Sequence, residues 1–281
     1  MKRRVLVAGC GYVGAEVAAR LAARGQEVFG LRRAGAGPDG VTMVHADLTS
    51  PASLAQLPEG ITHLVYAAAA SGFGESAYEA AYVDGVRNVL AAVGARGGAL
   101  ERVVFTSSTS VYAQSDGESV DEGSLTAPSS FAGEAMLRGE ALVLGGPWTG
   151  VVLRLGGIYG PGRTRLLDEV RSRSVALTDG PPIYTNRIHR DDCAGAIVHL
   201  LELLAPDGIY NGVDAASAPR NEVLAWLAER LGVGPLESGG VESLPARTLR
   251  SNKRVSGERL RRSGYTLGYP TWREGYGGMM G

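Results

Sequence analysis

A glycine-rich turn within residues 4–23 constrains the fold of this chain more than any other feature. Glycines stand at positions 9, 11 and 14 in the pattern GxGxxG, directly after a strand-like apolar run and before apolar residues at helical spacing. Gly9 permits the tight turn, Gly11 lets the backbone approach a diphosphate, and Gly14 lets helix and strand pack closely. The alternative is a loop that merely requires glycine in a chain that holds 41 of them. We expect the positive helix end to bind a dinucleotide through Gly9, Gly11, Tyr12, Val13 and Gly14.

Composition excludes several classes of protein. The 281 residues are 44% hydrophobic, which is enough for a substantial core. The formal net charge is −1 and the charges are interspersed, so we expect no nucleic-acid or membrane partner. No apolar run approaches the roughly 18 residues of a membrane span, and the first run is too short for a signal peptide, so we expect a cytoplasmic protein. Cys10 and Cys193 are too few for a disulfide framework, and the histidines lack metal-ligand spacing, so no metal is expected.

Two arginines follow the second predicted strand, residues 27–31. At this strand end an NAD site usually offers an acidic side chain to the ribose hydroxyls, whereas an arginine suits the extra phosphate of NADP. Arg32 and Arg33 therefore favour NADP as the cofactor, with NAD as the other possibility. The alternative is that both are solvated surface arginines.

Further strands alternate with helices in the first half of the chain. A predicted strand at 41–45 leads to Asp47 and Leu48, where Asp47 either lies over the adenine or is only a loop residue. The apolar run 61–70 is typical of a central parallel strand buried on both faces, and a helix is expected at 76–95. Small residues at the end of that strand would let a cofactor pass closely, namely Ala67, Ala68 and Ala69.

A strand at 102–105 opens into a hydroxyl-rich segment that begins with Thr106 and Ser107, at the expected ligand crevice. This alternation predicts an α/β fold, a doubly wound parallel Rossmann sheet with its ligand at the carboxyl edge and a small C-terminal α/β lobe. We expect a dinucleotide-binding domain at 1–155, to which 187–213 return. The small substrate-binding lobe would comprise 156–186 and 214–281.

With these elements in place, the chain resembles the extended and atypical short-chain dehydrogenase/reductases, often called NAD-dependent epimerase/dehydratases. The segments that carry the resemblance are GCGYVG at 9–14, HADL at 45–48, SSTSVY at 107–112, RLGGIYGPGR at 154–163 and RIHRDDCAGAI at 187–197. They follow the family's order over most of the chain. The resemblance implies an NAD(P)-binding Rossmann fold and places Ser108 where the family's catalytic serine or threonine bonds the substrate oxygen.

The sequence departs from this family at its tyrosine–lysine dyad. In the family the tyrosine donates or takes the proton, and a lysine four residues later lowers the pKa of that tyrosine and holds the nicotinamide ribose. The matching positions here hold Phe131 and Ala135, and neither Lys2 nor Lys253 has a tyrosine four residues before it. Tyr82 stands where the family has a helix asparagine. A phenyl ring has no proton to transfer, and a positioned general acid or base contributes about 100- to 10,000-fold in rate.

Other residues must therefore supply the proton if the protein is an enzyme. Besides Ser108, the catalytic candidates are Tyr112 and His189, with Tyr159 or a water as further possible donors. His189 can exchange a proton near neutral pH, but it is equally well explained as a satisfied structural histidine. Arg154 either borders the nicotinamide or is a buried arginine that pairs with a carboxylate.

The remaining candidates lie in the second half of the chain. Asp191 or Asp192 is expected to cap a helix that continues through residue 204. By resemblance, the side chains just upstream face the substrate pocket. Adjacent cations at 253 and 254 would meet an anionic group or would simply be solvated. The expected substrate contacts are Tyr159, Arg187, Lys253 and Arg254.

Two hypotheses of different class follow. The first is an NADP(H)-dependent oxidoreductase or epimerase/dehydratase-like enzyme that acts on a small polar substrate similar to a nucleotide sugar. The second is a catalytically weak NADP(H)-binding protein that senses the state of the cofactor. The missing dyad favours the second, and the retained serine cluster and GIYGPGR loop favour the first. The pattern also leaves a homodimer possible.

Overall fold

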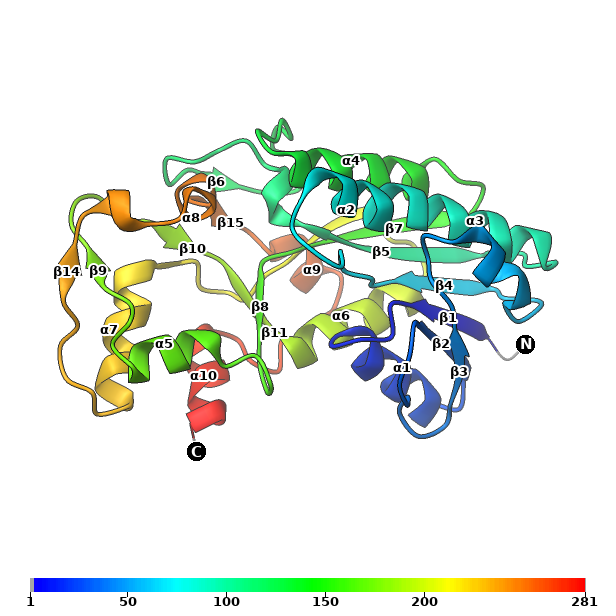
Figure 1. Ribbon diagram of the computed structural model, residues 1–281, viewed down its shortest axis with the longest axis horizontal. Coiled ribbons are helices and arrows are strands. Elements are labelled where there is room, and N and C mark those ends of the chain that lie inside the picture. The colour runs from blue at the N-terminus through cyan, green and yellow to red at the C-terminus, as the bar shows by residue number, and fades with distance from the viewer. Residues whose placement is uncertain (1–2, 281) are drawn as a thin grey trace.

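A seven-stranded parallel sheet forms the centre of the protein, of which the computed structural model describes residues 3–280 (Figure 1). Its strands are β1 (Arg4–Ala8), β2 (Glu27–Arg32), β3 (Val41–His45), β4 (His63–Tyr66), β5 (Arg102–Ser108), β7 (Thr149–Leu155) and β12 (Ile209–Gly212). The strand order is β12-β7-β5-β4-β1-β2-β3, and every neighbouring pair is parallel. The order reverses between β1 and β4, which is the switch point of a doubly wound sheet. The predicted α/β Rossmann fold is therefore confirmed.

Helices cover both faces of this sheet (Figure 1). On one face α1 (Gly14–Ala23) packs against α6 (Arg190–Glu202), and on the other α3 (Gly85–Ala95) contacts α4 (Phe131–Leu144). The central strands are buried on both sides, which explains their almost continuous apolar sequence. β3 is less buried because it forms one edge of the sheet.

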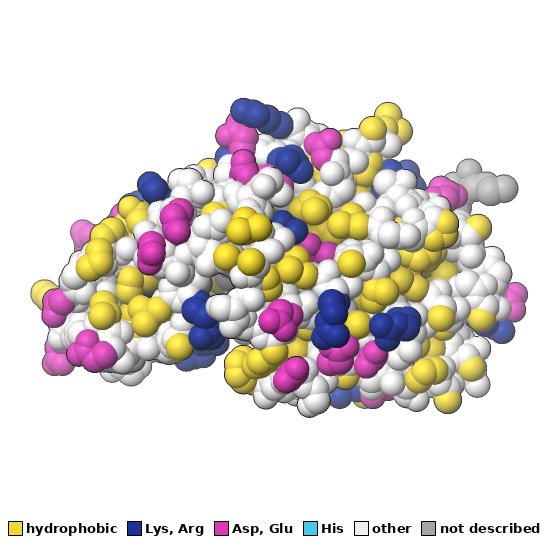
Figure 2. Space-filling model, turned by 90° about the horizontal axis from the view of Figure 1, so that it is seen from above, with side chains coloured by type: hydrophobic (Ala, Val, Ile, Leu, Met, Phe, Trp, Pro, Cys, Tyr) yellow, Lys and Arg dark blue, Asp and Glu magenta, His cyan; other side chains and the backbone are white. Residues whose placement is uncertain are grey.

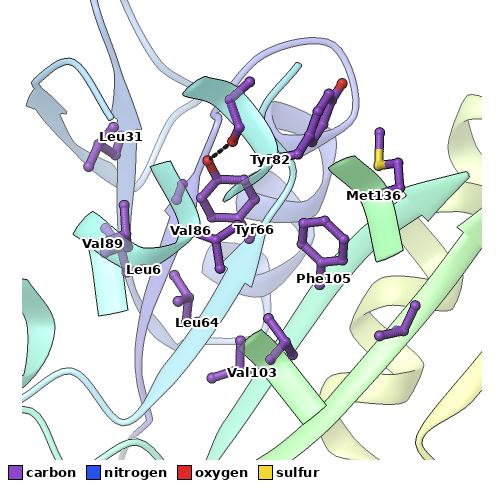
Figure 3. Close-up of a cluster of buried hydrophobic side chains, with 14 of the residues drawn as sticks. Leu6, Leu31, Leu64, Tyr66, Tyr82, Val86, Val89, Val103, Phe105 and Met136 are labelled. Atoms are coloured by element: carbon purple, nitrogen blue, oxygen red, sulfur yellow. Dashed lines mark hydrogen bonds between the residues drawn. The ribbon is translucent and has the colours of Figure 1, made fainter. Parts of the chain in front are cut away.

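The core under α3 and α4 contains two large aromatic side chains from neighbouring strands (Figure 3). Tyr66 of β4 and Phe105 of β5 are fully buried, with ring centroids 5.8 Å apart. The Tyr66 hydroxyl donates a hydrogen bond to the backbone carbonyl of Ala81. A buried phenol needs such a partner, so this bond fixes the helical segment above the sheet relative to β4.

Several predicted elements differ in extent from those observed. The strand expected at 102–105 reaches Ser108 in β5, and the helix expected through 204 ends at Glu202. The expected strand at 61–70 is shorter in the structure and comprises only β4. The N–H of Ala67 donates a last hydrogen bond to the carbonyl of Ala8, and the chain then leaves the sheet. The expected helix at 76–95 comprises α2 (Glu75–Glu79), a π-helical turn η2 (Ala80–Asp84) and α3. The π turn contains the Ala81 carbonyl that receives the Tyr66 hydroxyl, so a tertiary contact accompanies the irregular winding.

The expected aspartate cap of α6 is wrong. His189 is the N-cap residue, and its Nδ1 accepts a hydrogen bond from the backbone N–H of Asp191 at 3.3 Å. The buried Asp192 carboxylate instead accepts the Tyr265 hydroxyl at 3.0 Å and two backbone N–H groups of the C-terminal segment at 2.7 and 2.9 Å. Asp192 therefore holds the C-terminal segment against α6.

A further apolar cluster lies beyond the carboxyl edge of the sheet. It surrounds the fully buried Trp272 and is enclosed by α5 (Arg165–Arg171), α7 (Arg220–Arg230) and α10 (Trp272–Met280). Short strand pairs join this region together, namely β8 (Gly157–Tyr159) with β11 (Arg187–His189), β9 (Leu177–Thr178) with β14 (Ser238–Gly239), β10 (Tyr184–Thr185) with β13 (Ala218–Pro219), and β6 (Ser119–Val120) with β15 (Arg254–Val255). The remaining elements are η1 (Pro51–Gln56), η3 (Thr109–Val111), η4 (Val241–Ser243), α8 (Ala246–Arg250) and α9 (Glu258–Arg262).

The face seen in Figure 2 carries positive and negative side chains side by side, with small groups of apolar side chains between them. This distribution agrees with the interspersed charges of the sequence. Within residues 3–280, no helix has both the length and the apolar character that crossing a bilayer requires.

Candidate functional site

A cavity of about 2420 Å³ runs along the carboxyl edge of the sheet and continues beside α5, α7 and α8. Nearly every expected cofactor residue lines it: Gly9, Gly11, Tyr12, Val13, Arg32, Arg33, Asp47, Leu48, Ala67, Ala68, Ala69, Thr106 and Ser107. Gly14 is not among the lining residues. Ligands of open α/β sheets bind at this edge, next to the switch point of the strand order.

Each glycine of the first turn has a different environment. Gly9 has φ +93°, and a Cβ there would lie 2.3 Å from the backbone nitrogen of Ala68. A Cβ on Gly14 would lie 2.2 Å from the carbonyl oxygen of Gly9, so the helix and the turn approach each other more closely than any other residue allows. Gly11 has no atom within 4 Å of such a Cβ, and it faces the cavity.

The turn is therefore shaped for a group that approaches the backbone at Gly11. No side chain caps the N-terminus of α1, whose first residues follow Tyr12 and Val13 of the cavity wall. The buried Tyr12 hydroxyl has no hydrogen-bond partner within the described residues. An uncapped helix start attracts an anion. These features fit the diphosphate of a dinucleotide.

Arg163 is a cationic neighbour of this turn that the sequence analysis did not assign to the cofactor. Its Cζ lies 4.3 Å from the centroid of the Tyr12 ring, and both residues line the cavity. In the described part of the chain, no carboxylate pairs with the Arg163 side chain within 4 Å. The only signal in the sequence is its place at the end of the GIYGPGR segment, beside two glycines.

Arg32, the last residue of β2, and Arg33 also line the cavity. Arg32 donates one hydrogen bond, to the carbonyl oxygen of Ala36 at 3.2 Å, and neither Arg32 nor Arg33 forms an ion pair within 4 Å in the described residues. Nearby, Asp47 accepts hydrogen bonds from the backbone and side chain of Thr49 at 2.9 and 2.8 Å. These bonds lower the pKa of Asp47 and hold its carboxylate in the loop.

Two serines of the hydroxyl-rich segment, Ser107 and Ser108, form the end of β5, and their hydroxyls have different partners. Ser108 lines the cavity, and its Oγ accepts the backbone N–H of Ser110 at 3.2 Å, which leaves its own proton available. The buried Ser107 hydroxyl donates to Glu140 at 2.6 Å. Ser108 is therefore the hydroxyl of this pair that a substrate oxygen can reach.

Arg154 was expected either to border the nicotinamide or to pair with a carboxylate as a buried residue. The structure shows the buried pair. Its Nε and Nη2 donate to the two carboxylate oxygens of Glu140 at 3.0 and 2.7 Å, and both side chains are only 4% exposed. Its Nη1 donates to the Tyr112 hydroxyl at 3.1 Å. A bidentate buried pair of this kind fixes α4 against β7 beneath the serine segment.

Tyr112 lines the cavity, but its hydroxyl already belongs to this buried network. It donates to Oδ1 of Asn211 at 2.8 Å while it accepts from Arg154. Burial raises the pKa of Tyr112, against the opposing effect of these hydrogen bonds. The proton of Tyr112 is therefore directed away from the cavity, which argues against Tyr112 as the proton donor.

His189 is separated from the cavity. It is only 2% exposed, it is not among the lining residues, and its Nδ1 caps α6. Its ring packs against Tyr269 with centroids 3.8 Å apart and against Tyr159 at 5.4 Å. Burial lowers the pKa of His189. Its position is that of a structural histidine, not of a residue that faces a substrate.

Three of the four expected substrate contacts line the cavity, namely Tyr159, Arg187 and Lys253. The Tyr159 ring stacks on Tyr276 with centroids 4.4 Å apart, and its hydroxyl faces the backbone of α10 at Gly275. Lys253 donates to the carbonyl oxygen of Arg250 at 2.9 Å, and burial lowers its pKa to about 8. The cavity wall thus carries a cation at position 253 near neutral pH.

Arg254 differs from its neighbour. It is not a lining residue, its Nε donates to the carbonyl oxygen of Gly117 at 2.9 Å, and its Cζ lies 5.1 Å from the centroid of the Tyr184 ring. These contacts explain Arg254 as a link between β15 and the segment before β6. Its expected role as a substrate contact has no support in this placement.

Asp214 is a buried carboxyl group next to this region that the sequence analysis missed. It is 3% exposed, its Oδ1 accepts the N–H of Ala216 at 3.0 Å, and its Oδ2 has no partner in the described residues. Burial raises the pKa of Asp214 to about 7, although Arg187 opposes this shift. No local pattern in the sequence signals such a group, because its burial depends on segments far along the chain.

Asp214 should make the protein less stable as the pH rises. The native carboxyl keeps its proton to about pH 7, whereas the unfolded one loses it near pH 4, so stability falls between these values. We expect Asp214→Asn to remove up to about 4 kcal/mol of this pH dependence. Urea unfolding of both proteins at several pH values from 4 to 8 measures it. Parallel stability profiles for the two proteins would contradict the assignment.

Comparisons with known proteins agree with this site. The profile of the NAD-dependent epimerase/dehydratase family matches residues 5–211. Protein YeeZ of Escherichia coli K12 is 31% identical over 249 residues, which cover 83% of this chain and 85% of YeeZ. The 3-diazoavenalumate denitrifying reductase of a Streptomyces species is 28% identical over 307 aligned residues, with 98% of this chain and 99% of the reductase covered.

A solved structure from Methylobacillus flagellatus, described as an NAD-dependent epimerase/dehydratase, is 37% identical and superposes with a TM-score of 0.81. The similarity covers 100% of this chain and 98% of that protein. The family profile spans both the glycine turn and the serine segment that line the cavity. This chain is a member of the NAD-dependent epimerase/dehydratase family.

Proposed function

We propose that this protein is an NADP(H)-dependent oxidoreductase that transfers a hydride to or from a carbonyl or hydroxyl of a small polar substrate. The observation that carries the proposal is the shared cavity. An uncapped helix start, two arginines that form no ion pair in the described residues, and the Ser108 hydroxyl all line it. The relatives described as an epimerase/dehydratase and a reductase support the same reaction class.

Each group of lining residues has its own role in this proposal. Arg32 and Arg33 would bind the ribose phosphate, and the glycine turn with Arg163 would bind the diphosphate. The nicotinamide supplies the hydride when the cofactor is bound. Ser108 would orient the substrate oxygen, while Arg187 and Lys253 would hold an anionic group. In this proposal the proton comes from water, because Tyr112 and His189 are both committed to other contacts.

Replacement of both arginines by alanine should abolish the preference for NADPH. Arg32→Ala/Arg33→Ala removes the charge-assisted hydrogen bonds to the phosphate, each worth about 1.5–3 kcal/mol, so we expect the Kd of NADPH to rise at least tenfold (~1.4 kcal/mol). The Kd of NADH should stay unchanged. Fluorescence titration of each nucleotide measures both constants, with Arg262→Ala on α9 as a control. An unchanged ratio of the two constants would contradict the assignment of NADP.

Ser108→Ala tests the reaction itself. Loss of a hydrogen bond to a developing oxyanion should lower kcat/KM by at least about tenfold without changing the Kd of NADPH. The assay follows the absorbance of NADPH in the presence of a library of carbonyl compounds. If a compound is reduced at the same rate by both proteins, Ser108 has no role in the reaction.

The alternative function is a sensor that binds NADP(H) without turnover. The observation in its favour is that the proton of Tyr112 points into the buried network and that His189 lies outside the cavity. Saturable NADPH binding, with no oxidation of NADPH by any compound of the library, would favour this alternative. Both proposals assume the predicted division of the chain into a dinucleotide-binding domain and a substrate-binding lobe.

A further inference from the structure

Four aromatic side chains form one wall of the cavity, and we refer to them as the aromatic wall. They are Phe73 before α2, Tyr78 of α2, Tyr82 of η2 and Phe131, the first residue of α4. The Phe131 ring lies 5.3 Å from Phe73 and 5.4 Å from Tyr78, at interplanar angles of 64° and 83°. Tyr78 lies 5.3 Å from Tyr82. Phe73, Tyr78 and Phe131 therefore pack edge to face, and the Tyr82 ring is tilted by 52° against Tyr78.

This wall is open to the cavity, and two of its four side chains are phenylalanines. Phe73 is 83% exposed, although it lines the cavity. Phe73 and Phe131 have no polar side-chain atom, whereas the Tyr82 hydroxyl accepts the N–H of Ala70 at 3.3 Å and keeps its own proton to donate. An exposed phenyl group is stabilised when a ligand covers it. A sugar ring would bring hydroxyl groups to Phe73 and Phe131, which have no polar atom to offer them.

The aromatic wall lies next to the expected reaction centre. A Cβ on Gly133 of α4 would lie 2.8 Å from the carbonyl oxygen of Ser110, so the first turn of α4 packs directly on the turn that follows Ser108. Phe131 belongs to this first turn of α4, and it lines the same cavity as Ser108.

We propose that the substrate presents a planar aromatic ring to the aromatic wall, where it continues the edge-to-face packing of Phe73, Tyr78 and Phe131. This inference rests on the proposed function, because it places the ring at the same reaction centre. It narrows the substrate to an aromatic compound with an acidic group, since Arg187 and Lys253 line the same cavity. The selectivity arises because aromatic pairs gain stability beyond the area that they bury.

The test compares two acids of similar size that differ in planarity, trans-cinnamate and 3-cyclohexylpropanoate, in the presence of saturating NADP⁺. Isothermal titration and saturation-transfer NMR give the affinities, and UDP-glucose is the sugar-nucleotide probe. We expect cinnamate to bind about fivefold more tightly than the cyclohexyl acid. Phe131→Leu and Phe73→Leu should each reduce this preference to less than about twofold. Leu204→Ala, at a side chain that is 97% exposed and outside the cavity lining, should leave it unchanged.

The outcomes separate this inference from the proposed function. Equal binding of the two acids, or tighter binding of UDP-glucose that Phe131→Leu does not affect, would overturn the aromatic substrate while NADP⁺ still binds. Failure of NADP⁺ to bind in a separate titration without the acids would overturn the proposed function instead. Because Phe73 is exposed, Phe73→Leu should retain the fold and provides a second variant if Phe131→Leu unfolds.

Discussion

Glu140→Gln should destabilise the protein by about 3–5 kcal/mol. The substitution keeps the shape of the side chain but leaves the Arg154 guanidinium without its counter-charge at a site where both residues are 4% exposed. It also weakens the hydrogen bond that Glu140 accepts from Ser107 at 2.6 Å. A buried cation without a partner is costly because its hydration cannot be restored. Urea unfolding measures the loss as a lower midpoint at an unchanged slope.

Two further variants separate the cost of the unpaired charge from the value of the pair. Arg262→Ala on α9 removes an exposed pair with Glu258, whose side chains are 78% and 51% exposed, and should change stability by less than about 1 kcal/mol. Glu140→Leu/Arg154→Met removes both buried charges and should recover most of the stability lost in Glu140→Gln. A Glu140→Gln protein as stable as the Arg262→Ala control would show that this pair contributes little.

The sequence is most informative where a structural pattern is local. The strand at 41–45 is observed with those bounds, and the glycine turn joins β1 to α1 as expected. Apolar periodicity and glycine spacing depend only on neighbouring residues, so one segment is sufficient to recognise them. The alternation of strands and helices also predicted the doubly wound parallel sheet, which the observed strand order confirms.

Contacts between distant segments were not predictable in the same way. The sequence did not decide whether Arg154 borders the nicotinamide or pairs with a carboxylate. Its partner Glu140 is 14 positions away, on a helix where it resembles any surface glutamate. The stacking of Arg163 on Tyr12 joins residues 151 positions apart and has no pattern of its own. The same holds for His189, whose role as a helix cap depends on where β11 ends. The preference for NADP stays a prediction, since Arg32 and Arg33 are placed beside the cavity but their ligand is a proposal.

Gly11→Ala should impair dinucleotide binding without loss of the fold, whereas Gly9→Ala should destabilise the fold itself. A Cβ on Gly11 meets no protein atom within 4 Å and lies outside the left-handed region, so unfolding should shift by less than about 0.5 kcal/mol. That methyl group enters the space through which a diphosphate approaches the backbone. We therefore expect the Kd of NADPH to rise at least tenfold, or ~1.4 kcal/mol.

Gly9→Ala is the matched substitution two residues earlier in the same turn. Its Cβ would lie 2.3 Å from the Ala68 backbone at φ +93°, and both segments continue directly from the paired strands β1 and β4, whose last pair is Ala8 with Tyr66. Backbone strain and overpacking together should cost at least about 3 kcal/mol. Urea unfolding and NADPH titration of both variants decide the issue. If Gly11→Ala binds NADPH as the original protein does, the diphosphate does not lie against this turn, and the cofactor site must be placed elsewhere.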